Sequence, residues 1–238
     1  MTYVEGFLTP VPTANKDKYV EHATDAAEMI KRNGATRFVE TWGDDVPRGK
    51  LNDLWGAVQA KDDEAVLFSW FEYPDKATRD AANQKMMDDP AMEEMAKDMP
   101  FDGGRMIYAG FAGINEAGPG GEFGYLDGVV APVTTAKKGE YTAFCKLAAE
   151  VFIEHGATRV VDTWGDDVSD GKQTDYKRAT HLEEDETVAY GWIEWPSKDV
   201  RDKAWERIMQ DDRLSGGGDA GMQGQRMMFG GFRPLLVF

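Results

Sequence analysis

The sequence predicts an α+β fold in which two tandem ferredoxin-like (βαββαβ) domains pack against each other within one chain. The stretch Thr41-Trp42-Gly43-Asp44-Asp45-Val46 returns at residues 163–168, an offset of 122 residues. Each copy carries the same order of expected elements, strand, helix, strand, strand, helix, strand, which is the order of a split βαβ unit. The expected strands are apolar on both faces, so the sheet face without helices also needs a cover. The other copy would supply it, and we therefore expect an intramolecular pseudo-dimer.

The repeat divides the chain into two domains and a linker. We assign residues 1–112 to the first domain and residues 123–238 to the second. The stretch 113–122 between them contains Ala117-Gly118-Pro119-Gly120-Gly121, a composition typical of a flexible connection. A one-residue gap late in the repeat brings residues 105–111 into register with residues 226–232.

The first strand and helix of a copy are bounded by proline and glycine. Residues 3–8 are apolar and aromatic, and Pro10 is expected to end that strand. A helix is expected over residues 16–33, and Gly34 would end it in the left-handed conformation. Its apolar stripe at helical spacing consists of Tyr19, Ala23, Ala26, Ala27 and Ile30.

The other strands follow from alternation and apolar runs. Residues 37–42 alternate between two faces, and Gly43-Asp44-Asp45 is expected to turn out of that strand. Residues 56–60 are expected to be extended and to form a hairpin with the strong apolar run 66–73. Residues 105–111 form the last expected strand.

The second helix is expected to begin after Asp75, a natural N-cap, and to run to about residue 88. Ser197 takes the same place in the second copy. The methionines between Met86 and Met99 follow a break in the helix, and we expect them to pack under a loop.

The composition bounds the classes of function. Apolar residues make up 42% of the chain, enough for a core in each copy, and the formal net charge is −16. A charge of that sign repels phosphate backbones and anionic lipids, which argues against nucleic-acid and membrane-surface partners. The single cysteine, Cys145, lies on the apolar stripe of its helix, and we expect it to be a small buried apolar residue. Without a recognisable signal peptide or membrane helix, we expect a cytoplasmic protein.

A set of short motifs in the first copy resembles a known bacterial family. They are Tyr3-Val4-Glu5-Gly6-Phe7, Pro10 to Lys16, Trp42 to Val46, Gln59-Ala60-Lys61, Phe68-Ser69-Trp70, Met99 to Gly103 and Arg105 to Tyr108. In this combination they are similar to the YbaA-like proteins, short single-domain proteins of unknown function grouped with the dimeric α+β barrels. The second copy is less similar, with Thr134 in place of Pro12 and His181 in place of Gln59.

The resemblance implies a tandem YbaA-like duplication folded as an intramolecular dimeric α+β barrel. That superfamily holds cofactor-free monooxygenases, muconolactone isomerase-like enzymes and haem-handling enzymes, together with members of no known activity. The resemblance therefore implies the fold and leaves the function open.

Acidic residues inside apolar strands are the sharpest chemical signal. Desolvation raises the pKa of a carboxyl group towards the range useful for general acid or base catalysis. The candidate catalytic residues are Glu40 and Glu72 in the first copy and Asp162 and Glu194 in the second; Glu5 and Asp127 occupy similar strand positions. The alternative is that arginines pair with these carboxylates near the strand ends.

Aromatic and basic strand residues are the candidate ligand-binding groups. They are Trp42, Trp70, Trp164 and Trp192, with Arg37 and Arg159. The tryptophans would form the wall of a cavity, and the alternative is that they belong to the core.

Histidine and metal sites are not expected. None of His22, His155 and His181 has a histidine at the matching position of the other copy, which excludes a duplicated histidine-dependent or haem-ligating site. Asp44-Asp45 and its repeat pair oxygens in a turn, but neighbouring residues seldom reach one ion. We expect no metal and no cofactor, and a metal-dependent enzyme at these turns ranks last.

Besides the metal-dependent enzyme that ranks last, two classes of function remain open. The first is a small-molecule-binding barrel, to which the resemblance adds cofactor-independent monooxygenase- or isomerase-like chemistry. Its partner would be a small-molecule ligand, and the pseudo-dimer leaves further oligomerisation open. The alternative is a non-enzymatic structural, interaction or stress-related protein in which duplication makes an obligate dimer covalent.

Overall fold

Two half-sheets, one from each repeat, close into a single eight-stranded barrel. The computed structural model describes residues 2–238. The strands follow the order β1-β3-β2-β8-β5-β7-β6-β4 around the barrel. The first repeat comprises β1 (Tyr3–Pro12), α1 (Lys16–Arg32), β2 (Arg37–Asp45), α2 (Leu54–Ala57), β3 (Glu64–Tyr73), α3 (Lys76–Met87), α4 (Pro90–Lys97) and β4 (Ile107–Ala117). The second comprises β5 (Tyr125–Thr134), α5 (Lys138–Glu154), β6 (Arg159–Asp167), α6 (Tyr176–Ala179), β7 (Glu186–Trp195), α7 (Lys198–Ile208) and β8 (Met228–Val237).

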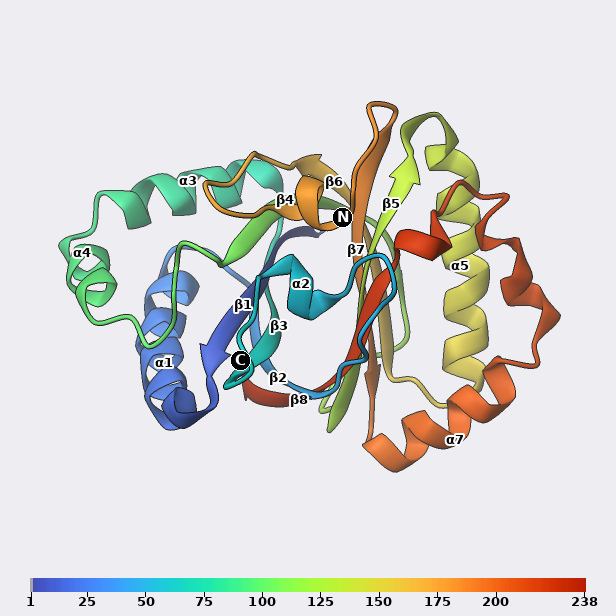
Figure 1. Ribbon diagram of the computed structural model, residues 1–238, viewed down its shortest axis with the longest axis horizontal. Coiled ribbons are helices and arrows are strands. Elements are labelled where there is room, and N and C mark those ends of the chain that lie inside the picture. Colours follow the sequence, from blue (N-terminus) through green and yellow to red (C-terminus); the bar gives the residue numbers. More distant parts are fainter. Residues whose placement is uncertain (1) are drawn as a thin grey trace.

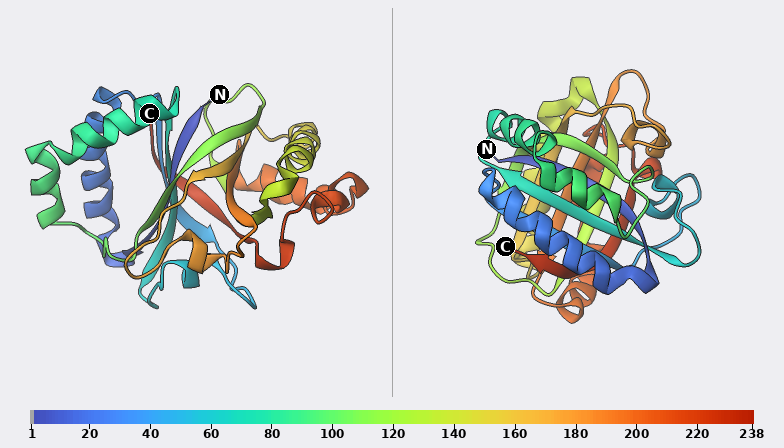
Figure 2. Two further views of the ribbon diagram at one scale, coloured as in Figure 1. Left: turned by 90° about the horizontal axis from the view of Figure 1, so that it is seen from above. Right: turned by 90° about the vertical axis from the view of Figure 1, so that its left-hand side faces the viewer.

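The predicted α+β pseudo-dimer is confirmed. Within each repeat the strands pair as in a ferredoxin-like unit, and the two seams of the barrel, β2 with β8 and β4 with β6, each join one repeat to the other. The helices α1, α3 and α4 cover the outer face of one half of the barrel, and α5 and α7 cover the other (Figure 1). A view onto the first repeat shows α1 and α3 lying across its strands (Figure 2).

The barrel interior is filled by aromatic side chains that meet across the repeats. The ring centroids of Trp70 and Trp192 lie 4.2 Å apart, and those of Phe68 and Tyr190 lie 4.3 Å apart in a stacked pair. All four side chains are at most 1% exposed. The interior is therefore one core that neither repeat completes by itself.

The repeated Trp-Gly-Asp-Asp motif fastens the two halves together. Instead of turning out of the strand, residues 43–45 stay in β2 and pair with β8 through an irregular register. Asp44 accepts hydrogen bonds from Tyr125 Oη at 3.0 Å and Arg233 Nε at 2.8 Å, both in the second repeat. Asp45 pairs with Arg201 at 3.0 Å. The corresponding contacts of the second copy run from Asp166 and Asp167 to Tyr3, Lys76 and Arg79.

Several element boundaries differ from the sequence-based expectation. β1 continues through Pro10 to Pro12, because its pairing with β4 stops at Leu8 and the missing N–H groups face no neighbouring strand. Residues 113–117, expected in the linker, belong to β4 and pair with β6. The connection between the repeats is correspondingly shorter.

The segment before β3 and the segment after α3 are helical. Residues 54–57 form the short helix α2, which Asp53 caps by accepting a hydrogen bond from Gly56 N at 2.6 Å, so the extended segment expected at 56–60 is wrong. The methionine-rich stretch is not a loop either. Asp89 caps the helix α4 and Pro90 begins it, an arrangement that favours helix initiation.

Within residues 2–238, none of the helices combines the length and the apolar character that a membrane crossing requires.

Because the core is shared, damage to one repeat should destabilise both. We expect Trp70→Ala to lower the free energy of unfolding by about 3–5 kcal/mol, the usual cost of removing a buried aromatic side chain. Urea denaturation followed by tryptophan fluorescence and by circular dichroism should give one coincident transition. Leu51→Ala, at a position 57% exposed, is the control and should change stability by no more than about 0.5 kcal/mol. Two transitions, only one of them shifted, would contradict a shared core.

Candidate functional site

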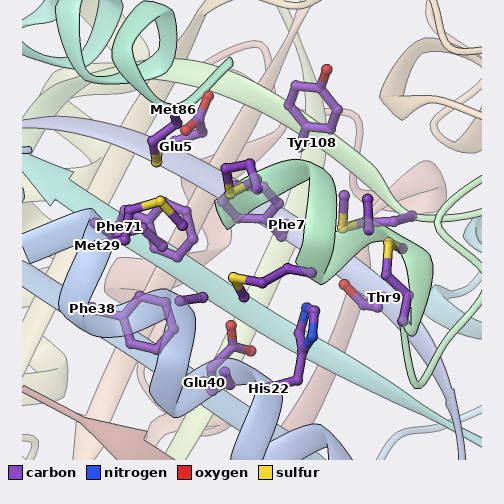
Figure 3. Close-up of a pocket in the computed structure, with 18 of the residues that line it drawn as sticks. Glu5, Phe7, Thr9, His22, Met29, Phe38, Glu40, Phe71, Met86 and Tyr108 are labelled. Carbon is purple, nitrogen blue, oxygen red and sulfur yellow. The ribbon is translucent and has the colours of Figure 1, made fainter. Parts of the chain in front are cut away.

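A pocket of about 420 Å³ lies between the helices of the first repeat and the outer face of its strands. β1, β2 and β3 provide its floor, and α1, α3, α4 and the segment after α4 provide its walls (Figure 3). Most of the lining side chains are apolar. Its size and lining are typical of sites for small organic ligands.

The floor is a group of phenylalanine rings. Alternate residues of a strand point to the same face, so Phe7, Phe38 and Phe71 all point out of the barrel towards the helices. The centroid of the Phe71 ring lies 4.7 Å from that of Phe7 and 4.9 Å from that of Phe38. Tyr108, which is 57% exposed, stacks on Phe7 at 5.8 Å and forms the outer edge. This floor suits a flat, apolar molecule.

Methionines form much of the opposite wall. They are Met29, Met86, Met87, Met92, Met95, Met99 and Met106. Helix α4 supplies Met92 and Met95, yet none of its residues is buried. Since methionine is flexible and polarisable, this wall can adapt to the shape of an occupant.

Glu40 is the carboxylate at one end of the pocket. It is 6% exposed, and Tyr19 and Ser69 both donate hydrogen bonds to its Oε2 atom. No donor among residues 2–238 reaches its Oε1 atom. Burial raises the pKa of Glu40 to about 7, and the hydrogen bonds from Ser69 and Tyr19 offset only part of that effect. The group can therefore gain or lose a proton near neutral pH.

A second buried carboxylate, Glu5, lies at the other end of the phenylalanine floor (Figure 3). Asn83 Nδ2 donates to Glu5 Oε1 at 2.9 Å, and Arg79 Nη1 lies 3.5 Å from the same atom. Burial raises the pKa of Glu5 despite these contacts. His22 also lines the pocket, and burial lowers its pKa, which favours the neutral imidazole.

The candidates Glu72 and Glu194 lie elsewhere, at one end of the barrel interior. Arg159 holds Glu72 through two hydrogen bonds of 2.7 and 2.8 Å, and Arg37 binds Glu194 at 3.0 Å. Burial opposes ionisation of Glu72, but the hydrogen bonds from Arg159 outweigh it and lower the pKa of that carboxyl group. Both pairs cross between the repeats, so here the structure favours the ion-pair alternative.

The four tryptophans do not line the pocket. Trp70 and Trp192 form a tilted pair inside the barrel; Trp70 donates its Nε1–H to Glu72, and Trp192 donates its Nε1–H to Glu194. Trp42 lies under Lys16, whose Nζ is 4.9 Å from its ring centroid, and Trp164 lies under Lys138 at 5.2 Å. Phenylalanines and methionines provide the wall that we expected from tryptophan.

In the second repeat the matching positions carry different side chains. Asp162, the counterpart of Glu40, accepts a hydrogen bond from Asn115 at 2.9 Å, and burial raises its pKa to about 6. Trp205 stands where the first repeat has Asn83 and packs edge-on against Phe152 at 5.6 Å. Asp162 therefore has a different donor from Glu40, with Asn115 bonded to it and Gly191 at the position of Ser69.

The carboxylates of Asp44 and Asp166 already bind basic groups, Arg233 and Lys76, respectively. Across residues 2–238, no three or more histidine, cysteine or acidic side chains converge as metal ligands would.

The fold and the pocket together define an α+β barrel built as an intramolecular pseudo-dimer with a ligand-sized pocket in its first half. The chain belongs to the family described as protein of unknown function DUF1428, whose model matches residues 2–103 and 124–229. It is 56% identical over 114 residues to the uncharacterized protein YbaA of Escherichia coli, a match that covers 48% of this chain and 97% of that protein.

Solved structures share the barrel at low sequence identity. An anthrone oxidase-like protein matches with a TM-score of 0.59 and 10% identity, covering 100% of this chain and 92% of its own. A candidate monooxygenase of Lactobacillus acidophilus matches with a TM-score of 0.57 and 8% identity, covering 99% and 95%. At such identities the likeness concerns the fold alone.

The sequence pattern proposes Glu40 as a candidate but not the side chains around it. Tyr19 belongs to the predicted apolar stripe, and His22 has no counterpart in the second copy. The usable signal was the difference between the copies, since Ser69 and Asn83 correspond to Gly191 and Trp205. Polar residues replaced by glycine or a large ring mark the positions at which the two repeats differ around this pocket.

The raised pKa of Glu40 makes a prediction about stability. The folded state binds this proton more tightly than the unfolded state, so its ionisation costs stability progressively from pH 4.5 to about 7. Glutamine does not titrate, so the free energy of unfolding of Glu40→Gln should rise relative to that of the wild type by about 3 kcal/mol across this pH range. Urea titrations at a series of pH values measure this difference.

Asp162→Asn is the matched control in the second repeat. Its gain should be complete by about pH 6, the pKa to which burial raises Asp162. A stability difference between Glu40→Gln and wild type that does not change with pH would show that Glu40 titrates normally.

Proposed function

We propose that the first repeat binds a small, flat and largely apolar molecule, and that Glu40 exchanges a proton with it. The observation that carries this proposal is a buried carboxylate in an apolar pocket with one oxygen left free of protein donors. A buried carboxylate without enough hydrogen bonds is costly, and such groups gather at functional sites.

The chemistry follows from the hydrogen bonds of Glu40. Tyr19 and Ser69 fix the carboxylate through Oε2, which leaves Oε1 to take a proton from a ligand O–H, or from a C–H next to a carbonyl group. A pKa of about 7 lets the same group return that proton at another position. Such a transfer would serve isomerase-like or cofactor-independent monooxygenase-like reactions, two of the activities found in the superfamily that the sequence resembles.

The names of two structural neighbours mention oxidation chemistry, which is the only respect in which they agree with this proposal. One is named as anthrone oxidase-like and another as a candidate monooxygenase, but each shares at most 10% identity with this chain. The proposal therefore rests on the pocket.

A structural role is the second candidate, and it is favoured for the second repeat. There Trp205 stands in place of Asn83 and protein groups bond both oxygens of Asp127, and the end of the barrel interior is closed by arginine–glutamate pairs. In this view the second repeat replaces the partner subunit of a dimer, and only the first repeat binds a ligand.

One ligand per chain is therefore expected. We expect 2-naphthol, a flat apolar probe with one acidic hydroxyl, to bind in a 1:1 ratio by calorimetry. Asn83→Trp, which copies the second repeat, should fill the pocket and weaken binding by about 1.4 kcal/mol or more, a factor of about ten. Trp205→Asn in the second repeat is the control and should leave this site unaffected. Unchanged binding to Asn83→Trp would place the probe elsewhere.

Proton acceptance by Glu40 can be observed separately. Excitation makes 2-naphthol a much stronger acid, and its anion emits at longer wavelength than the neutral form. Above pH 7 we expect the bound probe to show anion emission in the wild type and much less of it in Glu40→Gln. Glu72→Gln, at the end of the barrel interior, is the control and should keep the wild-type emission. Equal emission from Glu40→Gln and wild type would rule out Glu40 as the acceptor.

A further inference from the structure

We infer that Glu5 and Asn83 form a second polar subsite, so that the ligand carries a hydrogen-bond donor at each end of an apolar body. This inference rests on the proposed binding function of the pocket and adds the chemical class of its ligand. It starts from the incomplete hydrogen bonding of Glu5, which is 3% exposed and lines the pocket.

The contacts of Glu5 all fall on one oxygen. Asn83 and Arg79 both approach Oε1, at 2.9 and 3.5 Å, and no donor among residues 2–238 reaches Oε2. Glu40 has the same arrangement, with its two donors on one oxygen and the other oxygen free. The pocket therefore holds two buried carboxylates, each lacking donors on one side.

The second repeat shows what a fully satisfied carboxylate looks like at this position. Asp127, the counterpart of Glu5, receives Arg201 on Oδ1 at 2.8 Å, and on Oδ2 it receives the indole N–H groups of Trp195 and Trp205 at 2.9 and 2.8 Å. Both oxygens are bonded, and the indole rings occupy the space. This end of the second repeat needs no ligand.

The first repeat replaces both indole donors. Asn83 stands in place of Trp205, and Tyr73 stands in place of Trp195. The Tyr73 hydroxyl is buried and has no hydrogen-bond partner within residues 2–238. Burial, followed by the charge of nearby Glu5, raises the pKa of Tyr73 and keeps it protonated. Neither replacement donates to the Oε2 atom of Glu5, so this atom of a pocket-lining carboxylate is the one that a ligand donor would complete.

The strand register sets the length of the ligand. Glu5 lies opposite Phe71, and Phe71 lies opposite Phe38, two residues before Glu40 on β2. Strand spacing and rise then separate the Cα atoms of Glu5 and Glu40 by about 12 Å. The Phe71 ring lies between them, so a body of two fused or linked rings would cover the floor and present a hydroxyl to each carboxylate.

Three naphthalene probes test the second subsite. They are 2-naphthol, 2,6-dihydroxynaphthalene and 6-methoxy-2-naphthol, the last of which cannot donate at its second end. We expect the wild type to bind the diol about tenfold or more tighter than the methoxy compound, as a hydrogen bond to a charged group provides. Equal affinities of the wild type for these two probes would overturn the inference without any variant.

Glu5→Gln distinguishes recognition from a structural role. Its amide oxygen would accept from Asn83, which turns the NH₂ group towards the pocket. We expect the preference for the diol to be lost or reversed, whereas 2-naphthol keeps its affinity. A merely structural Glu5 would weaken all three probes alike and leave the diol-to-methoxy ratio unchanged, which would refute the subsite.

The two proposals fail in different ways. If 2-naphthol does not bind the wild type, or binds Asn83→Trp equally well, then the proposed function fails and the subsite fails with it. If 2-naphthol binds and Asn83→Trp prevents it, but the diol-to-methoxy ratio is the same in wild type and Glu5→Gln, then only the subsite fails.

Discussion

The aromatic interior shared by the two repeats is the constraint on which the rest of the structure depends. Phe68 of one repeat packs where the other repeat has Gly128, and Tyr190 packs over Gly6, so close that a Cβ atom at either glycine would meet a ring at 2.9 Å or less. Each repeat thus makes room for the other's side chain. Because these rings fill the barrel, a ligand site has to lie outside it, between the strands and their helices.

The duplicated Trp-Gly-Asp-Asp motif follows from the same constraint. A closed barrel of two repeats has two equivalent seams, and each seam needs the same contacts. At one of them Asp44 binds Tyr125, and at the other Asp166 binds Tyr3. The glycine before each pair is also required by packing, since a Cβ atom at Gly43 would lie 2.7 Å from the carbonyl oxygen of Val66. The motif that reveals the duplication therefore joins the two repeats. Its carboxylates are already bound to basic groups and to tyrosine hydroxyls.

The sequence predicted the fold better than the site, and the reason lies in the strands. Repetition and the order of elements were enough to predict a pseudo-dimer. The strands, however, are apolar on both faces, so alternation could not tell which face points into the barrel. Glu40 and Glu72 looked alike for that reason. The structure places Glu40 on the helix side, in the pocket, and Glu72 on the inner side, in an ion pair. The fate of a strand carboxylate depends on this choice of face, which only the closed barrel determines.

The two repeats keep the same residues where they meet and differ in the space between their strands and helices, because barrel closure constrains only the former. Closing the barrel requires both halves to keep the inner face and the seams, so those residues recur in register. The side chains between the strands and the helices take no part in either seam, so they can differ between the repeats. In the second repeat Trp195 and Trp205 both donate to Oδ2 of Asp127, and Arg201 binds its Oδ1. The first repeat leaves the pocket open and leaves Glu5, Glu40 and Tyr73 short of partners. The second repeat thus satisfies its buried carboxylate with protein groups, whereas the first leaves one oxygen of Glu5 and one of Glu40 for the ligand that we propose.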